Sequence, residues 1–201
     1  MLDRIHQMVW KHVSLTEHPE HAVEIATIIS LWNSTEDVVA NYLELFFALE
    51  MGFSTALISS MQSSKAKVDF LSAAGAKFLA HDNELLQEFS KLINTLLKRI
   101  KQRNTYAHAI YVTNINEPGS LYMSDRTDNP FDISGYTKVS LHDLKSQVKL
   151  MVNAFDSSIL LYNKIYDRTP RKLLDSIGMV RLYKKIIADG HDLDKFGNTS
   201  S

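Results

Sequence analysis

The chain has 201 residues, of which 45% are hydrophobic and 22% charged, and a formal net charge of −1 at pH 7. This length and composition are typical of one globular domain with its own core. The near-zero net charge excludes a general attraction to nucleic acid, so such a partner must be bound by a local patch. The absence of cysteine excludes disulfides and thiolate metal sites and suits a reducing cytoplasm.

The sequence contains no pattern typical of a signal peptide or a membrane-spanning helix. No stretch approaches the roughly 20 apolar residues that span a bilayer, and the start of the chain lacks the apolar core of a signal peptide. We therefore expect a cytoplasmic protein with no membrane partner. One domain is expected over residues 1–189, followed by a flexible tail over 190–201.

Apolar residues at helical spacing predict an all-α fold. A short amphipathic segment over 2–13 comes first. Pro19 suits the first position of a helix, and residues 33–35 should end that helix and cap the next. This second helix is expected over about 38–51, with Gly52 as its C-terminal cap.

A third helical stretch covers about residues 54–80. The serine pairs at 59–60 and 63–64 are candidates for interrupting it. Gly75 lies among apolar residues in the second half of the stretch. Since glycine has no side chain, it permits the close approach of another helix.

The strongest helix signal covers residues 82–108. Asp82 or Asn83 can cap its start, and apolar side chains follow at steps of three and four residues. This stripe consists of Leu85, Leu86, Phe89, Leu92, Ile93, Leu96, Leu97 and Ile100. At about 100° per residue, Arg103 and Asn104 fall on the same stripe, and His108 lies one turn beyond Asn104. Polar groups on a buried stripe are costly unless paired, so they indicate a structural network or chemistry.

The pattern changes after His108. Short alternating apolar runs on either side of residues 116–119, which include Pro-Gly, predict a small hairpin. Residues 125–139 indicate a loop. Ser140 followed by Asp143 resembles a capping box, and a broad apolar face predicts a helix from there to the break at 169–170. A last, basic helix is expected over 171–188.

The three polar residues on the stripe favour phosphate chemistry. Arg103 offers a planar fork of donors for phosphate oxygens, and His108 can exchange protons near neutral pH. The amide of Asn104 could hydrogen-bond the imidazole of His108, four residues later. Arg103 and His108 diverge by about 140° on an ideal helix. They can meet at one phosphate if Arg103 reaches round, if the helix loosens near Tyr106, or if a second protomer brings its own pair.

Neighbouring residues add charge and aromatic rings. The cations before the motif, which make its approach electropositive, are Lys98, Arg99 and Lys101. Tyr106 and Tyr111 could stack on unpaired RNA bases or pack the hairpin against the helices. His18 and His21 stand three apart among acidic residues, which favours a solvated first turn over a metal site.

The segment Arg103-Asn104-Thr105-Tyr106-Ala107-His108 resembles the Arg-polar-x-x-x-His signature of the HEPN superfamily. The layout around it is loosely similar: helices before, a short hairpin or irregular insertion after, then a long helix. The resemblance implies an all-α bundle that acts as a metal-independent endoribonuclease and needs no cofactor. It also implies a role in toxin or antiviral defence systems. A toxin branch carries tyrosine two residues after the histidine, whereas Tyr111 lies three residues after His108.

The resemblance also implies roles. His108 would take the proton of a ribose 2′-hydroxyl or protonate the leaving 5′-oxygen, Arg103 would stabilise charge on the phosphate, and Asn104 would hold the imidazole or a phosphate oxygen. The expected RNA contacts are Tyr106, Lys98, Arg99, Lys101 and Tyr111. HEPN domains usually pair, which implies a homodimer with single-stranded RNA in the shared cleft and an antitoxin or regulatory protein as a further partner. The alternative is a non-catalytic helical module that binds a partner protein or a nucleotide.

Overall fold

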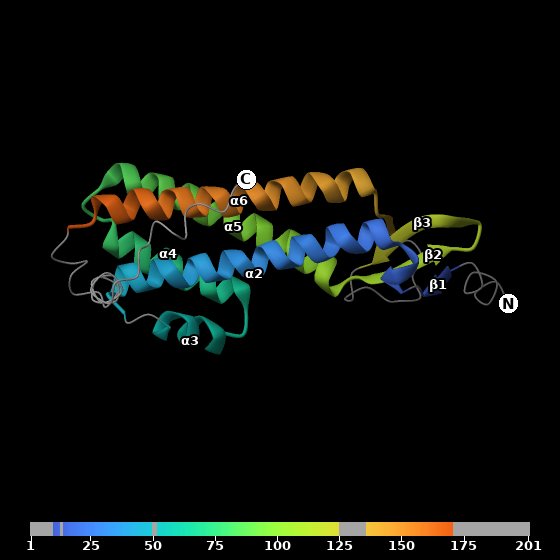
Figure 1. Ribbon diagram of the computed structural model, residues 1–201, viewed down its shortest axis with the longest axis horizontal. Helices are drawn as coiled ribbons and strands as arrows, with labels where there is room; N and C mark the ends of the chain where they lie inside the picture. The colour runs from blue at the N-terminus through green and yellow to red at the C-terminus, as the bar shows by residue number, and fades with distance from the viewer. Residues whose placement is uncertain (1–9, 13, 50–51, 125–135, 171–201) are drawn as a thin grey trace, which may run out of the picture. The chain divides into compact units, whose positions relative to one another are not determined.

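The computed structural model describes residues 10–12, 14–49, 52–124 and 136–170 (Figure 1). Its elements in chain order are β1 (Trp10–His12), the 3-10 helix η1 (Leu15–Glu17), α2 (Pro19–Phe47), α3 (Phe53–Ser60), α4 (Ser64–Phe78), α5 (Asn83–His108), β2 (Ile110–Asn114), β3 (Glu117–Ser124), β4 (Thr137–Lys138) and α6 (Leu141–Arg168). The predicted helical fold with a hairpin after the motif helix is therefore confirmed, while a HEPN-like arrangement stays a prediction. The predicted basic helix over 171–188 and the tail over 190–201 lie outside the described residues.

The chain divides into two compact units. Unit 1 comprises Met1–Thr35 and Asn94–Ser157, and unit 2 comprises Glu36–Ile93 and Ser158–Ser201. The long helices α2, α5 and α6 each contribute one part to each unit. The single domain expected over 1–189 stays a prediction.

Helix α2 continues through residues 33–35, where the sequence wrongly predicted the end of one helix and the start of another. The hydroxyl groups of Ser34 and Thr35 donate to the carbonyl oxygens of Ser30 and Leu31, at 3.3 and 2.8 Å. Because both side chains bond back one turn within the helix, they do not cap a new one. Thr35 is also buried, so the inner face of the helix is continuous at this point.

The end of α2 also differs from the prediction. Gly52 is not its C-terminal cap but the N-terminal cap of α3, with φ 91°. The helix ends at Phe47, and Ala48 follows in the left-handed conformation, with φ 51°. The amide of Leu49 then donates to the carbonyl oxygen of Glu44 at 3.1 Å, as in a Schellman motif. Glycine normally occupies such a position because a side chain is strained there.

Replacing Ala48 by glycine is therefore expected to stabilise the protein. Glycine adopts the left-handed conformation without steric cost, so Ala48→Gly should raise the free energy of unfolding by about 0.5–1 kcal/mol. Urea unfolding measures the change. Ala73→Gly, at an exposed position inside α4, is the matched control and should lower it by a similar amount. Equal losses in both variants would contradict the left-handed conformation at Ala48.

The predicted third helical stretch is interrupted, as the serine pairs indicated. It forms α3 and α4, with residues 61–63 between them. The Oγ of Ser63 accepts a hydrogen bond from the amide of Ala66 at 3.1 Å and so caps α4. The predicted close approach at Gly75 is also confirmed, because a Cβ at this position would overlap the ring of Phe89 in α5.

Aromatic rings fill the core of unit 2. The ring of Tyr42 lies 5.7 Å from that of Phe46, 5.8 Å from that of Phe89 and 5.3 Å from that of Tyr162, measured between centroids. Its hydroxyl donates to the carbonyl oxygen of Ser158 at 2.8 Å, and burial raises the pKa of Tyr42. The cluster therefore joins α2, α5 and α6 within this unit.

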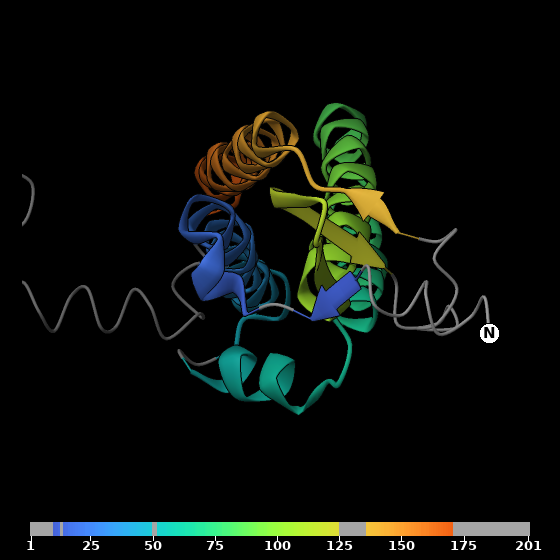
Figure 2. The same cartoon turned by 90° about the vertical axis from the view of Figure 1, so that its right-hand side faces the viewer.

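The four strands belong to unit 1 and form one antiparallel sheet in the order β1-β2-β3-β4 (Figure 2). The predicted hairpin is confirmed as β2 and β3, but its turn lies at 115–116, and Pro118 and Gly119 belong to β3. The side chain of Asn114 forms this turn by accepting from the amide of Asn116 at 2.9 Å. The strands β1 and β4, which the sequence analysis placed in an amphipathic segment and a loop, pair with the two edges of the hairpin.

The helix ends of unit 1 meet at this sheet. Helix α5 leads into β2 and helix α6 follows β4, so the two helices run antiparallel in this unit (Figure 2). Val139, between β4 and α6, donates its amide to Leu121 of β3 at 2.8 Å and accepts from Nε2 of His21 at 3.2 Å. The ring of His21 also packs edge-on against His18 at 5.8 Å. His21 thus connects the start of α2 to the residues just before α6.

Candidate functional site

Helix α5 carries the Arg-Asn-His motif into unit 1. The cap predicted at Asp82 is confirmed, because its Oδ1 accepts from the amide of Leu85 at 3.1 Å. Six of the eight stripe residues are buried, the last of them Ile100, which is 5% exposed, while Leu86 and Leu97 are half-buried. One turn later Arg103 is half-buried, while Asn104 and His108 are exposed. The stripe therefore ends in polar groups that open towards solvent.

Arg103 and Asn104 are in direct contact. Nη1 of Arg103 donates to Oδ1 of Asn104 at 3.1 Å. A hydrogen bond from the amide of Asn104 to the imidazole of His108, which the sequence spacing allowed, is not present in this structure. Asn104 thus orients the guanidinium group.

His108 is the last residue of α5, and its imidazole forms no hydrogen bond or ion pair with the described part of the chain. The helix stays regular from Asn83 to this residue and does not loosen near Tyr106. Arg103 and His108 therefore point about 140° apart around the axis. Within one chain they do not converge, and Arg103 turns to its neighbour Asn104 instead of reaching round.

Among the described residues, five buried side-chain atoms, all in unit 1, have no hydrogen-bond partner. They are Nε and Nη1 of Arg99, Oε1 of Gln102, Nε of Arg103 and Oε1 of Gln147. We call these four residues the polar cluster. Most buried polar atoms in proteins have a hydrogen-bond partner, so such a group needs an explanation. Burial also lowers the pKa of Arg99, although an arginine remains charged at neutral pH.

Gln147 belongs to the other long helix of this region, α6. Near the sheet, burial and the carboxylate of Asp143 in α6 raise the pKa of Tyr106 in α5, so these two residues are close. Because the helices are antiparallel here, Gln147, one turn after Asp143, is level with Arg103, about one turn before Tyr106. Neither Gln147 nor Gln102 was predicted as a site residue from the sequence. For Gln147 no local signal exists, since only packing brings it beside α5.

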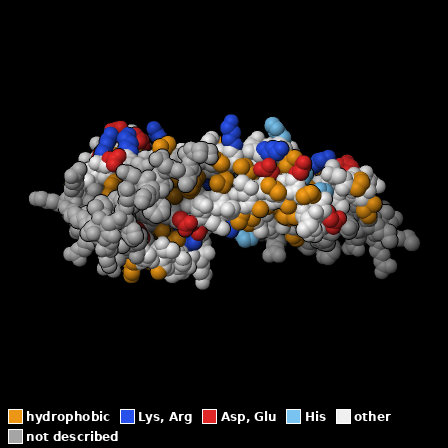
Figure 3. Space-filling model, in the orientation of Figure 1, with side chains coloured by type: hydrophobic (Ala, Val, Ile, Leu, Met, Phe, Trp, Pro, Cys, Tyr) orange, Lys and Arg blue, Asp and Glu red, His pale blue; other side chains and the backbone are white. Residues whose placement is uncertain are grey.

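Positive charge is concentrated on the last turns of α5. Lys98 and Lys101 are exposed, and neither they nor the two arginines form an ion pair within the described residues. On the face drawn in Figure 3, by contrast, basic side chains stand beside acidic ones and do not form one broad basic surface. Four cations thus lie within two turns of α5, and the local patch that the sequence predicts for nucleic acid stays a prediction.

The two tyrosines of the site differ in their contacts. The hydroxyl of Tyr111 donates to the carbonyl oxygen of Tyr106 at 2.6 Å, and burial raises the pKa of Tyr111. Tyr111 therefore fastens β2 to the end of α5. The side chain of Tyr106 is half-buried beside Asp143, so part of its ring can be reached from solvent.

The described residues contain no group of three histidine, aspartate or glutamate side chains that could hold a metal ion. In the same part of the chain, no helix combines the length and apolar character needed to cross a membrane. Comparisons with protein-family models, with curated proteins and with solved structures find no significant match for this chain.

Proposed function

We propose that this protein is a metal-independent endoribonuclease that cleaves single-stranded RNA at a composite site formed by two copies of the chain. One observation carries the proposal: the last turns of α5 hold a guanidinium with an unpartnered buried nitrogen and an imidazole with no partner. These are Arg103 and His108, the two residues of the HEPN-like motif. A role in toxin or antiviral defence, an antitoxin as regulator and a cytoplasmic location follow from the resemblance and the composition.

The reaction would be an internal transfer at phosphorus. The ribose 2′-oxygen attacks the adjacent phosphorus, the bond to the 5′-oxygen breaks, and the products carry a 2′,3′-cyclic phosphate and a 5′-hydroxyl. His108 takes the proton of the 2′-hydroxyl or donates one to the departing 5′-oxygen, and water completes the other transfer. Arg103, oriented by Asn104, stabilises the charge that develops on the phosphate oxygens. The nucleophile belongs to the substrate, so these residues need to supply only proton transfer and charge.

A second protomer would allow one Arg103 and one His108 to face the same phosphate. Because α5 is regular, Arg103 and His108 of one chain diverge and make a poor pair for one phosphate. In a two-fold symmetric dimer, each site can take Arg103 from one protomer and His108 from its partner. The homodimer is therefore part of the proposal.

The RNA backbone would approach along the cationic turns before the motif. Lys98 and Lys101 are exposed and supply positive charge, and Arg99 has two buried nitrogens with no partner. Tyr106 offers a ring on which a base can stack, and Tyr111 supports it through the carbonyl contact. Unpaired bases are the natural partners of such rings, which favours single-stranded RNA.

Incubation with single-stranded RNA in excess chelator tests the activity. The wild type should cut the RNA and leave 2′,3′-cyclic phosphate ends, and an oligonucleotide with 2′-deoxyribose at every position should stay intact. His108→Ala and Arg103→Ala should each be at least about a hundredfold slower. His142→Ala is the matched control, because this exposed histidine of unit 1 lies outside the motif.

The alternative is anion binding without cleavage. The exposed cations Lys98 and Lys101 favour it, because they can attract a phosphate with no proton transfer. RNA that binds in a way that depends on Arg103 but stays intact would support this alternative and overturn the nuclease. Cleavage that persists in both alanine variants would overturn the assigned site.

A further inference from the structure

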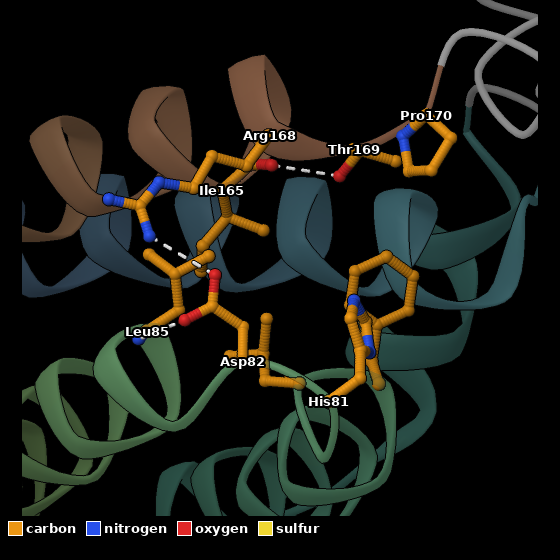
Figure 4. A pocket seen from close by; sticks show the side chains of 9 residues that line it. His81, Asp82, Leu85, Ile165, Arg168, Thr169 and Pro170 are labelled. Atoms are coloured by element: carbon orange, nitrogen blue, oxygen red, sulfur yellow. Dashed lines mark hydrogen bonds and ion pairs between the residues drawn. The ribbon is translucent and has the colours of Figure 1, made fainter.

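A pocket of about 280 Å³ in unit 2 lies between the end of α6 and the turn that leads from α4 into α5 (Figure 4). The two charged side chains in its described lining pair with each other, since Nη1 of Arg168 donates to Oδ2 of Asp82 at 3.1 Å. The other oxygen of Asp82 accepts from the amide of Leu85, and the hydroxyl of Thr169 donates to the carbonyl oxygen of Ile165 at 2.8 Å. The ion pair thus fastens the end of α6 to the start of α5, and the described lining indicates no class of ligand.

The last turn of α5, in unit 1, is held by a side chain from the sheet. A helix leaves the carbonyl oxygens of its last four residues without a partner inside the helix, and in α5 these are residues 105–108. The hydroxyl of Tyr111 in β2 donates to one of them, the carbonyl oxygen of Tyr106, at 2.6 Å. Tyr111 therefore caps the helix from the strand that follows it.

The sheet gives this contact a fixed support. Tyr111 pairs with Met123 of β3, and the preceding Ile110 pairs with Ser124, so β2 is paired from its first residue. The side chain of Tyr111 is half-buried, and burial raises its pKa, so the hydroxyl remains a donor at neutral and mildly alkaline pH. The bond closes a loop over residues 106–111, and His108 lies within this loop.

We infer that Tyr111 is a positioning residue for His108, an inference that rests on the proposed ribonuclease function. The imidazole of His108 forms no hydrogen bond or ion pair within the described residues, so its position depends on the backbone of the last turn. Arg103 precedes this turn and is oriented by Asn104, so it does not depend on Tyr111. Loss of the Tyr111 hydroxyl should therefore impair proton transfer by His108 and leave phosphate binding by Arg103 intact.

Tyr111→Phe tests the inference, because it removes the hydroxyl and keeps the ring. Its kcat on single-stranded RNA should fall at least about tenfold, since a small displacement of a reacting group slows the reaction steeply. Its KM should stay within about twofold of the wild-type value. The pH profile of kcat should keep its shape, because Tyr111 transfers no proton in the reaction.

Tyr122→Phe is the matched control. The hydroxyl of Tyr122 donates to the carboxylate of Glu117 at 2.8 Å, a bond within β3, so this variant should cut RNA like the wild type. A raised KM with unchanged kcat in Tyr111→Phe would assign Tyr111 to RNA binding, and a changed shape of the pH profile would make it a proton carrier. Either result would overturn the inference.

NMR relaxation gives a readout that does not depend on cleavage. In the wild type the amide order parameter of His108 should be about 0.85, as in a rigid helix, and in Tyr111→Phe it should fall below about 0.6. The order parameter of Arg103 should be the same in both proteins. A wild type that cuts no RNA would overturn the proposed function, while the order parameters still decide whether Tyr111 positions His108. An equally ordered His108 in Tyr111→Phe would overturn the inference, even if the wild type cuts RNA.

Discussion

Co-expression of Arg103→Ala and His108→Ala chains is expected to restore RNA cleavage, although neither variant cuts RNA alone. In a mixed dimer with shared sites, one site lacks both groups and the other keeps Arg103 from one chain and His108 from its partner. With random pairing, half of the dimers are mixed, so about a quarter of the wild-type sites should be active. Initial cleavage rates at equal protein concentration measure this fraction.

The control uses a chain with both substitutions. Paired with the Arg103→Ala chain, it can form no intact site and should restore nothing. Two different affinity tags, purified in sequence, establish that mixed dimers are present. If such dimers are inactive while the wild type cuts RNA, Arg103 and His108 act within one chain. A wild-type protein that sediments as a monomer at micromolar concentration would also contradict the shared site.

Replacing Gly75 by alanine is expected to destabilise the protein by about 1–3 kcal/mol, because the added methyl group overlaps the ring of Phe89. That ring has little room to move. It is 1% exposed, and its centroid lies 5.6 Å from that of Phe46 and 5.8 Å from that of Tyr42. The overlap outweighs the gain in helix propensity from glycine to alanine, which is about 1 kcal/mol at most. Thermal and urea unfolding measure the loss.

Two comparisons isolate the contact. Gly119→Ala should be nearly neutral, because a Cβ at that position meets nothing within 4 Å. Phe89→Leu removes the ring atoms that clash, so the double variant with Gly75→Ala should be more stable than the sum of the single losses implies. Strict additivity of the two losses would show that Gly75 and Phe89 do not interact.

Features that depend on neighbours within one helical turn could be predicted from the sequence. The caps at Asp82 and Ser140 are confirmed, the latter by the bond from the amide of Asp143 to Oγ of Ser140 at 3.3 Å. The break before Ser64 and the course of α5 to His108 are also as expected. Each of these features follows from local propensity and apolar spacing, which the chain carries wherever it packs.

Other segments are compatible with two local structures, and tertiary packing determines which of the two forms. Ser34 and Thr35 can cap a new helix or bond back within the old one, and the burial of Thr35 favours the second. Residues 10–12 and 137–138 become strands because the edges of the hairpin offer unpaired backbone groups. Neither outcome is visible in the few residues on each side.

At the candidate site, the sequence by itself determined that Arg103, Asn104 and His108 follow an apolar stripe at the end of one helix. The tertiary structure decided that Asn104 binds Arg103, that His108 has no partner within the described residues, and that the side-chain oxygen of Gln147 is buried. The physical reason is that spacing along a helix sets the direction of each side chain. Which groups a side chain contacts, and whether those groups are buried from water, depends on packing against a second helix that is remote in the sequence.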